Sequence, residues 1–463
     1  MMMNETICAI STAPGIGGIA VIRVSGAEAF SICDRIFQAK HTDKKLSTQK
    51  AYTLLYGTIL HNGEVVDNVM AAVFRSPHSF TGEDTVEISC HGSIYIQQQI
   101  LQLLTQHGCR LAKPGEYTQR AFMNGKMDLS QAEAVADLIA STSAGQHRLA
   151  INQMRGGFSQ ELKALREKLV HITSLMELEL DFADHEELEF ADRQELKNIA
   201  AQIEQTISKL AYSFKAGNAI KNGIPVTIVG ETNAGKSTLL NLLLNEEKAI
   251  VSDIHGTTRD VIEDTVNVQG ILFRFIDTAG IRETHDTIEA LGIERSFRAI
   301  ERADIVLWVI DQTEAEKQIT TLSDKVLPLC EGKQLILVLN KSDINTSSDT
   351  IGHLGFPKDT QTIPISAKYR EGIDQLQSLL LKAAHLPSIS SSDIIVTNVR
   401  HYEALTHALK AIRRVQEGLS TGLSGDLISQ DLRECIFHLS DIVGEVTTDE
   451  VLGNIFKHFC VGK

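Results

Sequence analysis

The stretch of residues 230–237, Gly-Glu-Thr-Asn-Ala-Gly-Lys-Ser, constrains the fold of this chain more than any other feature. Its spacing fits G-x-x-x-x-G-K-[ST], which is typical of a loop that cradles the phosphates of a nucleoside triphosphate. An apolar, β-branched segment precedes it at residues 225–229, and a helix-forming segment follows it at residues 238–244. A strand, a glycine-rich turn and a helix together point backbone N–H groups at an anion. The sequence therefore predicts a phosphate-binding loop here, in preference to a surface turn that contains a lysine.

Four more motifs follow in the order that a GTPase requires. A Gly-containing loop at residues 252–259 includes Thr-Thr-Arg, and Asp-Thr-Ala-Gly at residues 277–280 ends an apolar strand predicted at 271–276. Asn-Lys-Ser-Asp at residues 340–343 follows a strand predicted at 335–339, and Ser-Ala-Lys at residues 366–368 follows one predicted at 362–365. Each motif alone is weak evidence, but five of them in order at strand ends predict a guanine-nucleotide-binding domain.

These motifs assign expected roles to individual side chains. Lys236 would reach the β- and γ-phosphates, while the hydroxyl groups of Ser237 and Thr258 would hold magnesium. Asp277 would bind the water shell of magnesium, and the backbone amide of Gly280 would sense the γ-phosphate.

The base would be recognised by the last two motifs. Asp343 would accept hydrogen bonds from N1–H and the 2-amino group of guanine, a pair of donors that adenine lacks. The backbone amides of residues 366–368 would brace the base. The full predicted GTP-binding set is Asn233, Ala234, Gly235, Lys236, Ser237, Thr238, Ser252, Asp253, Ile254, His255, Gly256, Thr257, Thr258, Asp277, Thr278, Ala279, Gly280, Asn340, Lys341, Asp343, Ser366, Ala367 and Lys368.

Composition limits the class of protein. A net charge of −15 argues against indiscriminate nucleic-acid binding, without excluding a local basic patch. The seven cysteines are dispersed and form no CxxC pair, which suggests a reducing cytosol rather than a disulfide framework. No apolar run reaches the length of a membrane span, and the N-terminus lacks the pattern of a signal peptide. We therefore expect a cytoplasmic protein with no membrane partner.

The pattern along the chain predicts an α/β and all-α multidomain protein. Residues 1–124 read as a mixed α/β domain, and residues 217–386 as a Ras-like P-loop GTPase domain. Helical periodicity marks residues 125–216 and 387–463, which favours one helical domain with the GTPase domain inserted into it. The predicted apolar stripes are residues 129, 132, 135, 138 and 139; 162, 165, 169, 172, 175 and 176; 405, 408, 412, 415 and 419; 428, 432, 436, 439 and 442; and 451, 452, 455, 456 and 459. Independent coiled coils are the alternative, but glycines at 422, 425 and 444 interrupt the helical stripes. The acidic run at residues 181–189 is more typical of a solvent-exposed helix face than of a metal site.

With these parts placed, the whole chain resembles the family of tRNA-modification GTPases called MnmE or TrmE. The resemblance rests on residues 14–18, 79–84, 113–117, 120–129, 253–260 and the final Phe-Cys-Val-Gly-Lys at 459–463. The chain departs from the family pattern at Glu231-Thr232, where Arg-Pro is usual, at Ser252, where Thr is usual, and at Val461, where Ile is usual.

The resemblance implies a function and partners. Such proteins act with an FAD-dependent partner of the MnmG/GidA type, in a heterotetramer or larger assembly. Together they place an aminomethyl or carboxymethylaminomethyl group on C5 of the wobble uridine of certain tRNAs. The N-terminal domain would form a homodimer and bind 5-formyl- or 5,10-methylene-tetrahydrofolate, the one-carbon donor.

The resemblance also implies residues for the folate site and the modification. Arg23, Glu83, Lys126 and Lys463 would line the folate site. The simpler alternative is that Glu83 caps a turn and Lys126 is solvated. Cys460 would take part in tRNA modification, although an unpaired cysteine is commonly packed as a small apolar residue.

Hydrolysis needs groups that the usual small-GTPase pattern does not supply here. Ile281 stands where many GTPases have a water-positioning glutamine. By resemblance, a potassium ion held by Asn233, Ser252, Ile254 and Thr257 would replace an arginine finger.

The general base would come from the polar segment that follows. Glu283, His285, Asp286 and Glu289 are the candidates, and their spacing does not choose between them. The resemblance points to Glu289 as catalytic; otherwise Glu289 is an acid that interacts with the dipole at a helix start.

Two other classes of GTPase remain as rivals. An Era-like ribosome-assembly GTPase would carry a basic RNA-binding domain after the GTPase motifs, whereas the segment from about residue 387 is helical and slightly acidic. A dynamin-like, self-assembling GTPase would need much longer helical stalks.

Overall fold

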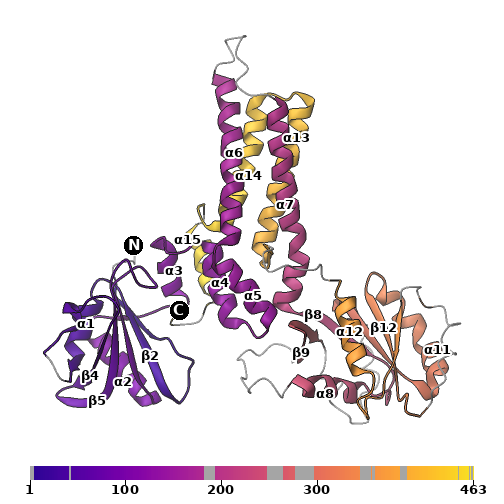
Figure 1. Ribbon diagram of the computed structural model, residues 1–463, viewed down its shortest axis with the longest axis horizontal. Coiled ribbons are helices and arrows are strands. Elements are labelled where there is room, and N and C mark those ends of the chain that lie inside the picture. Colours follow the sequence, from indigo (N-terminus) through magenta and orange to yellow (C-terminus); the bar gives the residue numbers. More distant parts are fainter. Residues whose placement is uncertain are drawn as a thin grey trace. The chain divides into compact units, whose positions relative to one another are not determined.

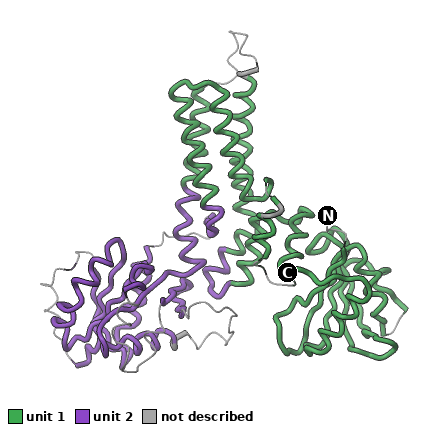
Figure 2. The backbone as a smooth tube through the Cα atoms, turned by 180° about the vertical axis from the view of Figure 1, so that it is seen from behind, with its two compact units in different colours: residues 1–140, 150–208, 403–463 green, residues 141–149, 209–402 purple. Residues whose placement is uncertain are grey.

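The computed structural model describes residues 5–40, 43–181, 193–247, 264–276, 297–344, 356, 360–385, 394–446, 448–457, 459 and 462. The chain divides into two compact units (Figure 2). Unit 1 comprises residues 1–140, 150–208 and 403–463, and unit 2 comprises residues 141–149 and 209–402. Unit 2 is thus built mainly from one continuous segment that lies between two segments of unit 1 in the sequence. The finer boundaries at 124, 216 and 386 stay predictions.

Unit 1 contains a seven-stranded sheet in the order β3-β4-β5-β6-β2-β1-β7. Its strands are β1 Ile7–Ile10, β2 Gly17–Ser25, β3 Phe37–Ala39, β4 Thr53–His61, β5 Glu64–Phe74, β6 Thr85–Gly92 and β7 Arg110–Leu111. All pairs are antiparallel except β1 with β7. Alternate side chains of the central strands, among them Ile22, Val24, Val86 and Ile88, are buried together with helices α1 (Ala29–Ile36) and α2 (Ile94–Gln106). This period-two burial is expected of a sheet with one covered face.

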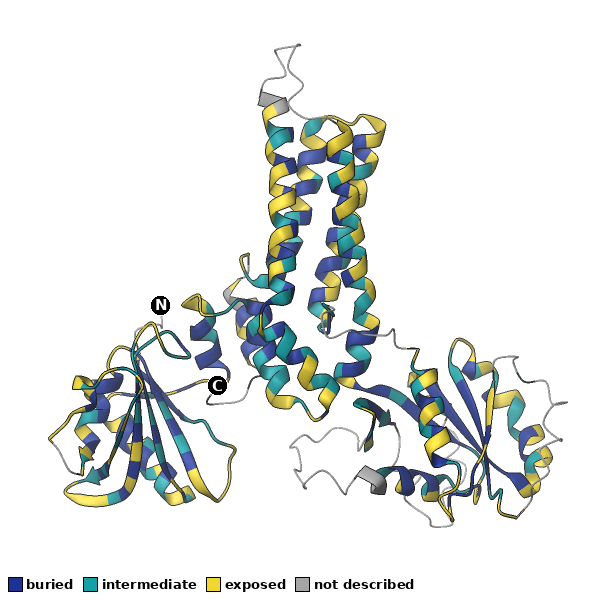
Figure 3. Cartoon of the chain, viewed as in Figure 1, coloured by how far each residue is buried: buried dark blue, intermediate teal, exposed yellow. Residues whose placement is uncertain are grey.

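The helices outside the two sheet regions are α3 Glu116–Met123, α4 Leu129–Ala140, α5 Ala144–Met154, α6 Gly157–Asp181, α7 Arg193–Asn222, α13 Val399–Thr421, α14 Gly425–Val443 and α15 Asp449–Phe456. Residues 144–149 of α5, 209–222 of α7 and 399–402 of α13 belong to unit 2, and the rest belong to unit 1. Helices α6 and α14 and the unit 1 parts of α7 and α13 lie side by side as a bundle (Figures 1 and 3). Helix α14 contacts both α6 and α4. Segments from distant parts of the sequence therefore share one core, which favours a single helical domain over independent coiled coils.

The predicted apolar stripes of two helices are confirmed. Residues 162, 165, 169, 172 and 176 of α6, and residues 405, 408, 412, 415 and 419 of α13, are all buried, whereas residue 175 of the α6 stripe is partly buried. Two residues assigned to other stripes are exposed instead: Ile139, in the last turn of α4, and Val451, in the first turn of α15. Both lie in an end turn of their helix. None of the helices described is long and apolar enough to cross a membrane.

Unit 2 is a doubly wound sheet of six strands in the order β13-β12-β11-β8-β10-β9. Its elements are β8 Ile224–Val229, α8 Lys236–Glu247, β9 Asp264–Val268, β10 Ile271–Phe275, β11 Ile305–Asp311, α11 Ala315–Val326, β12 Gln334–Asn340, β13 Gln361–Pro364 and α12 Ile373–Ala383. Only β9 runs antiparallel to its neighbour. The strands predicted at 225–229, 271–276, 335–339 and 362–365 are confirmed within a residue or two.

Helices cover both faces of this sheet. Along β11, Ile305, Leu307 and Val309 pack in the same cluster as α8 and α12, whereas Val306, Trp308 and Ile310 pack with α11. Strand β11 is therefore buried on both faces, as the central strand of a parallel sheet should be. The chain order reverses at β8, which has β10 on one side and β11 on the other. In open α/β sheets, ligands bind beyond the carboxyl ends of the strands at such a point.

The close approach of the loop after β8 to β11 can be tested at Gly230. Its φ is +148°, and a Cβ there would lie 2.1 Å from the carbonyl oxygen of Val309. We expect Gly230→Ala to lower the free energy of unfolding of unit 2 by about 2–4 kcal/mol, because backbone strain and a steric clash add. Trp308 is the only tryptophan and is fully buried in unit 2, so its fluorescence during urea unfolding measures this unit.

Gly332→Ala is the matched control. Gly332 also has a positive φ, +76°, but nothing lies within 4 Å of its Cβ position. This variant should lose only about 1 kcal/mol, the cost of the backbone conformation alone. Equal losses in the two variants would contradict the contact between the loop and β11.

Candidate functional site

The predicted phosphate loop connects the end of β8 to the start of α8, at the carboxyl edge of the unit 2 sheet. Asn233 has φ +64° and Gly235 has φ +98°, so the loop turns sharply before the helix begins. A Cβ at Gly235 would lie 2.0 Å from Nδ2 of Asn340, which leaves room only for glycine. Ser237 and Thr238 lie in the first turn of α8, where backbone N–H groups have no partner within the helix.

The side chain of Lys236 folds back over this loop. Its Nζ donates hydrogen bonds to the carbonyl oxygens of Gly230, at 2.8 Å, and Glu231, at 2.7 Å. Burial lowers the pKa of the Lys236 ammonium, and the charge of Glu231 offsets this only in part. A triphosphate would supply the negative charge that this partly desolvated cation lacks.

Asn340 joins three loops of the site. It is 4% exposed and ends β12. Its Nδ2 donates to the carbonyl oxygen of Ala234 at 2.8 Å, and its Oδ1 accepts from the backbone N–H of Ala367 at 3.0 Å. One buried amide therefore fixes the phosphate loop, the end of β12 and the loop after β13 to one another.

The predicted base-recognition residues lie together beside Asn340. Ser366 is fully buried, and its hydroxyl donates to Oδ1 of Asp343 at 2.7 Å. The amide of Ser342 donates to the carbonyl of Ile365 at 3.1 Å, so the two loops are also tied through their backbones. Asp343 is exposed, and its carboxylate keeps acceptor positions open for the two N–H donors of a guanine edge. The ammonium of Lys368 lies 5.1 Å from the centre of the Tyr369 ring.

Sequence reasoning missed Asp311, which fixes Lys341. The ammonium of Lys341 donates to Oδ2 of Asp311 at 2.5 Å, and Lys341 itself has φ +66°. Asp311 ends β11 and is the register partner of Asn340 on β12. Its signal in the sequence was an aspartate closing the apolar run of residues 305–310, but no strand was predicted there.

Several predicted residues lie outside the part of the chain that the structure describes. They are Ser252, Asp253, Ile254, His255, Gly256, Thr257, Thr258, Asp277, Thr278, Ala279, Gly280, Glu289, Cys460 and Lys463. The other candidate bases at 283, 285 and 286 and nearly all of the acidic run at 181–189 lie outside it too. Among the residues described, no group of three or more His, Cys, Asp or Glu side chains is placed to hold a metal ion.

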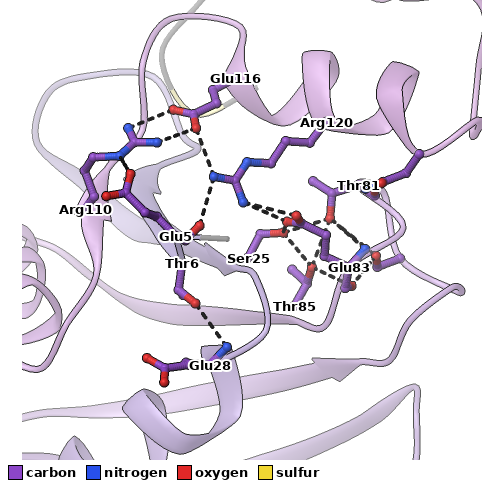
Figure 4. A network of polar contacts seen from close by, with 12 residues as sticks. Glu5, Thr6, Ser25, Glu28, Thr81, Glu83, Thr85, Arg110, Glu116 and Arg120 are labelled. Carbon is purple, nitrogen blue, oxygen red and sulfur yellow. Dashed lines mark hydrogen bonds and ion pairs between the residues drawn. The ribbon is translucent and has the colours of Figure 1, made fainter. Parts of the chain in front are cut away.

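Three of the four predicted folate residues gather around one loop of unit 1, between β5 and β6. The guanidinium of Arg23 lies 5.3 Å from the ring centre of Phe80. Lys126 donates to the carbonyl of Pro77 at 2.9 Å. Glu83 belongs to the loop itself, and it is more than the cap of a turn, because its carboxylate forms an ion pair with Arg120 (Figure 4).

The sequence did not single out the partners of Glu83. Arg120 is bound by both Glu83 and Glu116, and Glu116 is bound in turn by Arg110. The four-residue spacing of Glu116 and Arg120 on α3 was a usable signal, because such pairs face each other on a helix. The pairing of Arg120 with Glu83 left no signal in the sequence, since 37 residues separate these two residues in the chain.

Comparison with known proteins gives matches along the whole chain. The model of the MnmE helical domain matches residues 129–460, and the model of the GTP-binding protein TrmE N-terminus matches residues 6–126. The tRNA modification GTPase MnmE of Parabacteroides distasonis is 70% identical over 461 residues, covering 99% of this chain and 100% of that protein. Those of Bacteroides thetaiotaomicron and Porphyromonas gingivalis are 64% and 52% identical, each over at least 98% of both chains. A crystal structure of Aquifex aeolicus Era is 31% identical, covers 40% of this chain and 66% of its own, and has a TM-score of 0.27.

The ion pair of Asp311 predicts a dependence of stability on pH. Burial raises the pKa of the Asp311 carboxyl, but hydrogen bonds from Lys341 and Thr313 outweigh it, so the pKa lies below its usual value. A depressed pKa gives stability that is present above the unfolded-state value of about 4 and is lost as the pH falls through the folded-state value. Between about pH 5.5 and pH 3, the free energy of unfolding of wild-type unit 2 should fall by about 1 kcal/mol, after allowance for solvent around Lys341. Asp311→Asn should lack this contribution at every pH.

Urea unfolding followed by Trp308 fluorescence at a series of pH values measures this difference. Asp324→Asn is the control, because Asp324 is an exposed acid on α11 of the same unit. Its pH profile should match that of wild type. Parallel profiles for wild type and Asp311→Asn would show that the ion pair contributes nothing to stability.

Proposed function

Because the chain belongs to the MnmE family of tRNA modification GTPases, we propose that it couples GTP hydrolysis to modification of C5 of the wobble uridine in certain tRNAs. The group installed is a carboxymethylaminomethyl or aminomethyl group. We place this activity in the cytoplasm, where tRNA is modified and used.

One observation carries the nucleotide half of this proposal. The buried Asn340 amide holds the loop after β8 and the loop after β13 together, and we assign Lys236 to the phosphates and Asp343 to the base. The tRNA half rests on family membership across the full length of the chain. The Era-like rival is set aside, because the segment that would hold its RNA-binding domain instead matches the MnmE helical domain.

Magnesium belongs with the nucleotide in this family of GTPases. Ser237 fits this role, since its hydroxyl is carried on the first turn of α8 directly after Lys236. We propose Thr258 as the second hydroxyl ligand and Asp277 as the group that binds the water shell. A magnesium ion would neutralise charge on the β- and γ-phosphates during hydrolysis.

We also propose a homodimer, a partner protein that holds FAD, and a folate site in unit 1. We expect the homodimer to form through the sheet of unit 1, where Leu54, Tyr56 and Met70 are 56%, 44% and 37% exposed. Tyr56 and Met70 are opposite one another in β4 and β5, so these side chains form one apolar patch. A dimeric mass in sedimentation supports this surface, and a monomeric mass contradicts it.

The FAD stays with the MnmG/GidA-type partner, while tetrahydrofolate binds near Arg23, Glu83, Lys126 and Lys463.

The proposal as a whole is tested in a bacterium that lacks its own member of the family. Expression of this chain should restore the C5-modified wobble uridine, measured by mass spectrometry of tRNA nucleosides. Cys460→Ser should hydrolyse GTP normally while the modified nucleoside falls, if Cys460 acts in the modification. Failure of the wild-type chain to restore the nucleoside, together with co-sedimentation with ribosomes, would favour the Era-like function instead.

The choice of base is tested by Asp343→Asn. This variant loses the carboxylate acceptor for the two N–H donors of guanine and should prefer XTP to GTP. The preference should change by on the order of 10²-fold, because two charge-assisted hydrogen bonds are at stake. Steady-state kinetics with both nucleotides give the answer. An unchanged KM for GTP would show that Asp343 does not contact the base.

The hydrolysis step is tested by exchange of the cation. If Asn233, Ser252, Ile254 and Thr257 hold potassium, hydrolysis should be much faster in KCl than in NaCl at equal ionic strength. Asn233→Ala should remove this difference. Equal rates in both salts would argue for an arginine finger.

The general base is tested by Glu289→Ala in KCl. If Glu289 is the base, this variant should bind GTP normally yet lose at least about tenfold in kcat, whereas Asp286→Ala should lose far less. A wild-type kcat for Glu289→Ala would exclude Glu289 as the base.

A further inference from the structure

The carboxylate of Glu83 is held by two donors. Arg120 donates through one guanidinium nitrogen to Oε1 and Oε2 of Glu83, at 3.1 Å each. The Ser25 hydroxyl donates to Oε2 at 2.7 Å (Figure 4). Ser25 is fully buried and Arg120 has a side chain only 5% exposed, so neither donor can readily turn to water instead.

Arg120 is itself fixed from the opposite side. Its second guanidinium nitrogen donates to Oε1 of Glu116 at 3.0 Å and to the carbonyl of Glu5 at 2.9 Å. Burial raises the pKa of Glu116, but hydrogen bonds from Arg110, the Lys113 amide and Arg120 outweigh it and lower the pKa. Glu116 therefore stays charged and keeps the guanidinium of Arg120 aimed at Glu83.

The backbone of Glu83 is fixed as well. The hydroxyls of Ser79 and Thr85 donate to its carbonyl oxygen, and its N–H donates to the hydroxyl of Thr81. Thr81 and Thr85 are buried, so these bonds are shielded from water. The carboxylate can thus move little about its own backbone.

Stability alone gives a weak reason for this arrangement. Desolvation of a buried ion pair often cancels its Coulomb energy, so an apolar contact would hold the loop equally well. Among Glu83, Arg120 and Glu116, Glu83 has the most exposed side chain, at 18% against 5% for Arg120 and 10% for Glu116. A carboxylate has about four lone-pair positions, and the described donors occupy three of them here. One acceptor position, on Oε1, remains for a ligand.

We propose that Arg120 is a positioning residue, which holds the Glu83 carboxylate oriented to accept a hydrogen bond from an N–H group of a pterin ring. This inference rests on the folate binding proposed above and adds Arg120 and Glu116 to that site. The ring would approach from the side of Oε1. Arg23, whose guanidinium lies 5.3 Å and 5.5 Å from the ring centres of Phe80 and Tyr117, is held near the same loop.

Equilibrium dialysis of the full-length protein with 5-formyltetrahydrofolate tests the proposal. Arg120→Lys keeps the charge but cannot bond Glu83 and Glu116 at once, and it should raise the dissociation constant at least about tenfold. Glu116→Gln does not touch Glu83 and should weaken binding by a smaller factor, about threefold, because it only loosens Arg120.

The control is Arg75→Lys, in the same sheet region. The guanidinium of Arg75 also donates to two acceptors, the carbonyls of Gln49 and Ser47, and lies over the Phe30 ring. None of these partners is a residue that binds Glu83 or Arg120. The control should lower the melting temperature of unit 1 without changing the folate affinity. Thermal unfolding of all variants separates the two effects.

Each result has a distinct meaning. If wild type binds the folate and Arg120→Lys binds it equally well, the role of Arg120 is refuted while folate binding stands. If wild type binds none, the folate part of the proposed function fails, and the inference with it. Affinities that follow the melting temperatures of all three variants, Arg75→Lys included, reduce Arg120 to a structural role. Should Arg120→Lys not fold, an unchanged affinity in Glu116→Gln overturns the proposal.

Discussion

The nucleotide site depends on one buried side-chain amide. Asn340 donates to the carbonyl of Ala234 and accepts from the amide of Ala367, so the loops after three different strands cannot move apart without leaving buried polar groups unpaired. Ala234 is fully buried and Ala367 is 4% exposed, so water cannot easily replace either bond. An unpaired buried group costs about 1–3 kcal/mol, which makes the assembled form of these loops the favoured one before any ligand arrives.

The sheet places these loops at a common edge. Strands β8, β11, β12 and β13 are parallel, so their carboxyl ends meet, and the order reverses at β8 where the phosphate loop begins. Asp311 and Asn340 are register partners there, which lets Asp311 bind the side chain that follows Asn340. In unit 1, the Arg120 guanidinium joins α3 to the loop before β6 through the Glu83 carboxylate, while Glu116 on α3 binds Arg120 from the other side. In both units a buried or half-buried polar side chain is hydrogen-bonded to a residue that we propose for a site.

The sequence predicted the parts of this protein that depend on local spacing. The phosphate loop, its flanking strand and helix, and the strands before residues 340 and 366 were all found, because each motif is short and lies at a strand end. Asp311 and the partner of Glu83 were missed, because their roles depend on strand register and on contacts between distant segments. Among the apolar stripe residues, Ile139 and Val451 are exposed. Both lie in end turns of their helices, and a period of 3.6 carries no information on where the packed part of a helix ends.

The most direct test of this account is the affinity of Asn340→Ala for GDP, measured by isothermal titration beside Asn222→Ala, an exposed asparagine on α7 of the same unit. If Asn340 assembles the site, its variant should lose on the order of 10²-fold in affinity, while Asn222→Ala binds as wild type. Trp308 fluorescence should show that both variants keep a folded unit 2 at the temperature of the titration. A folded Asn340→Ala protein that binds GDP with wild-type affinity would contradict the central role of this amide.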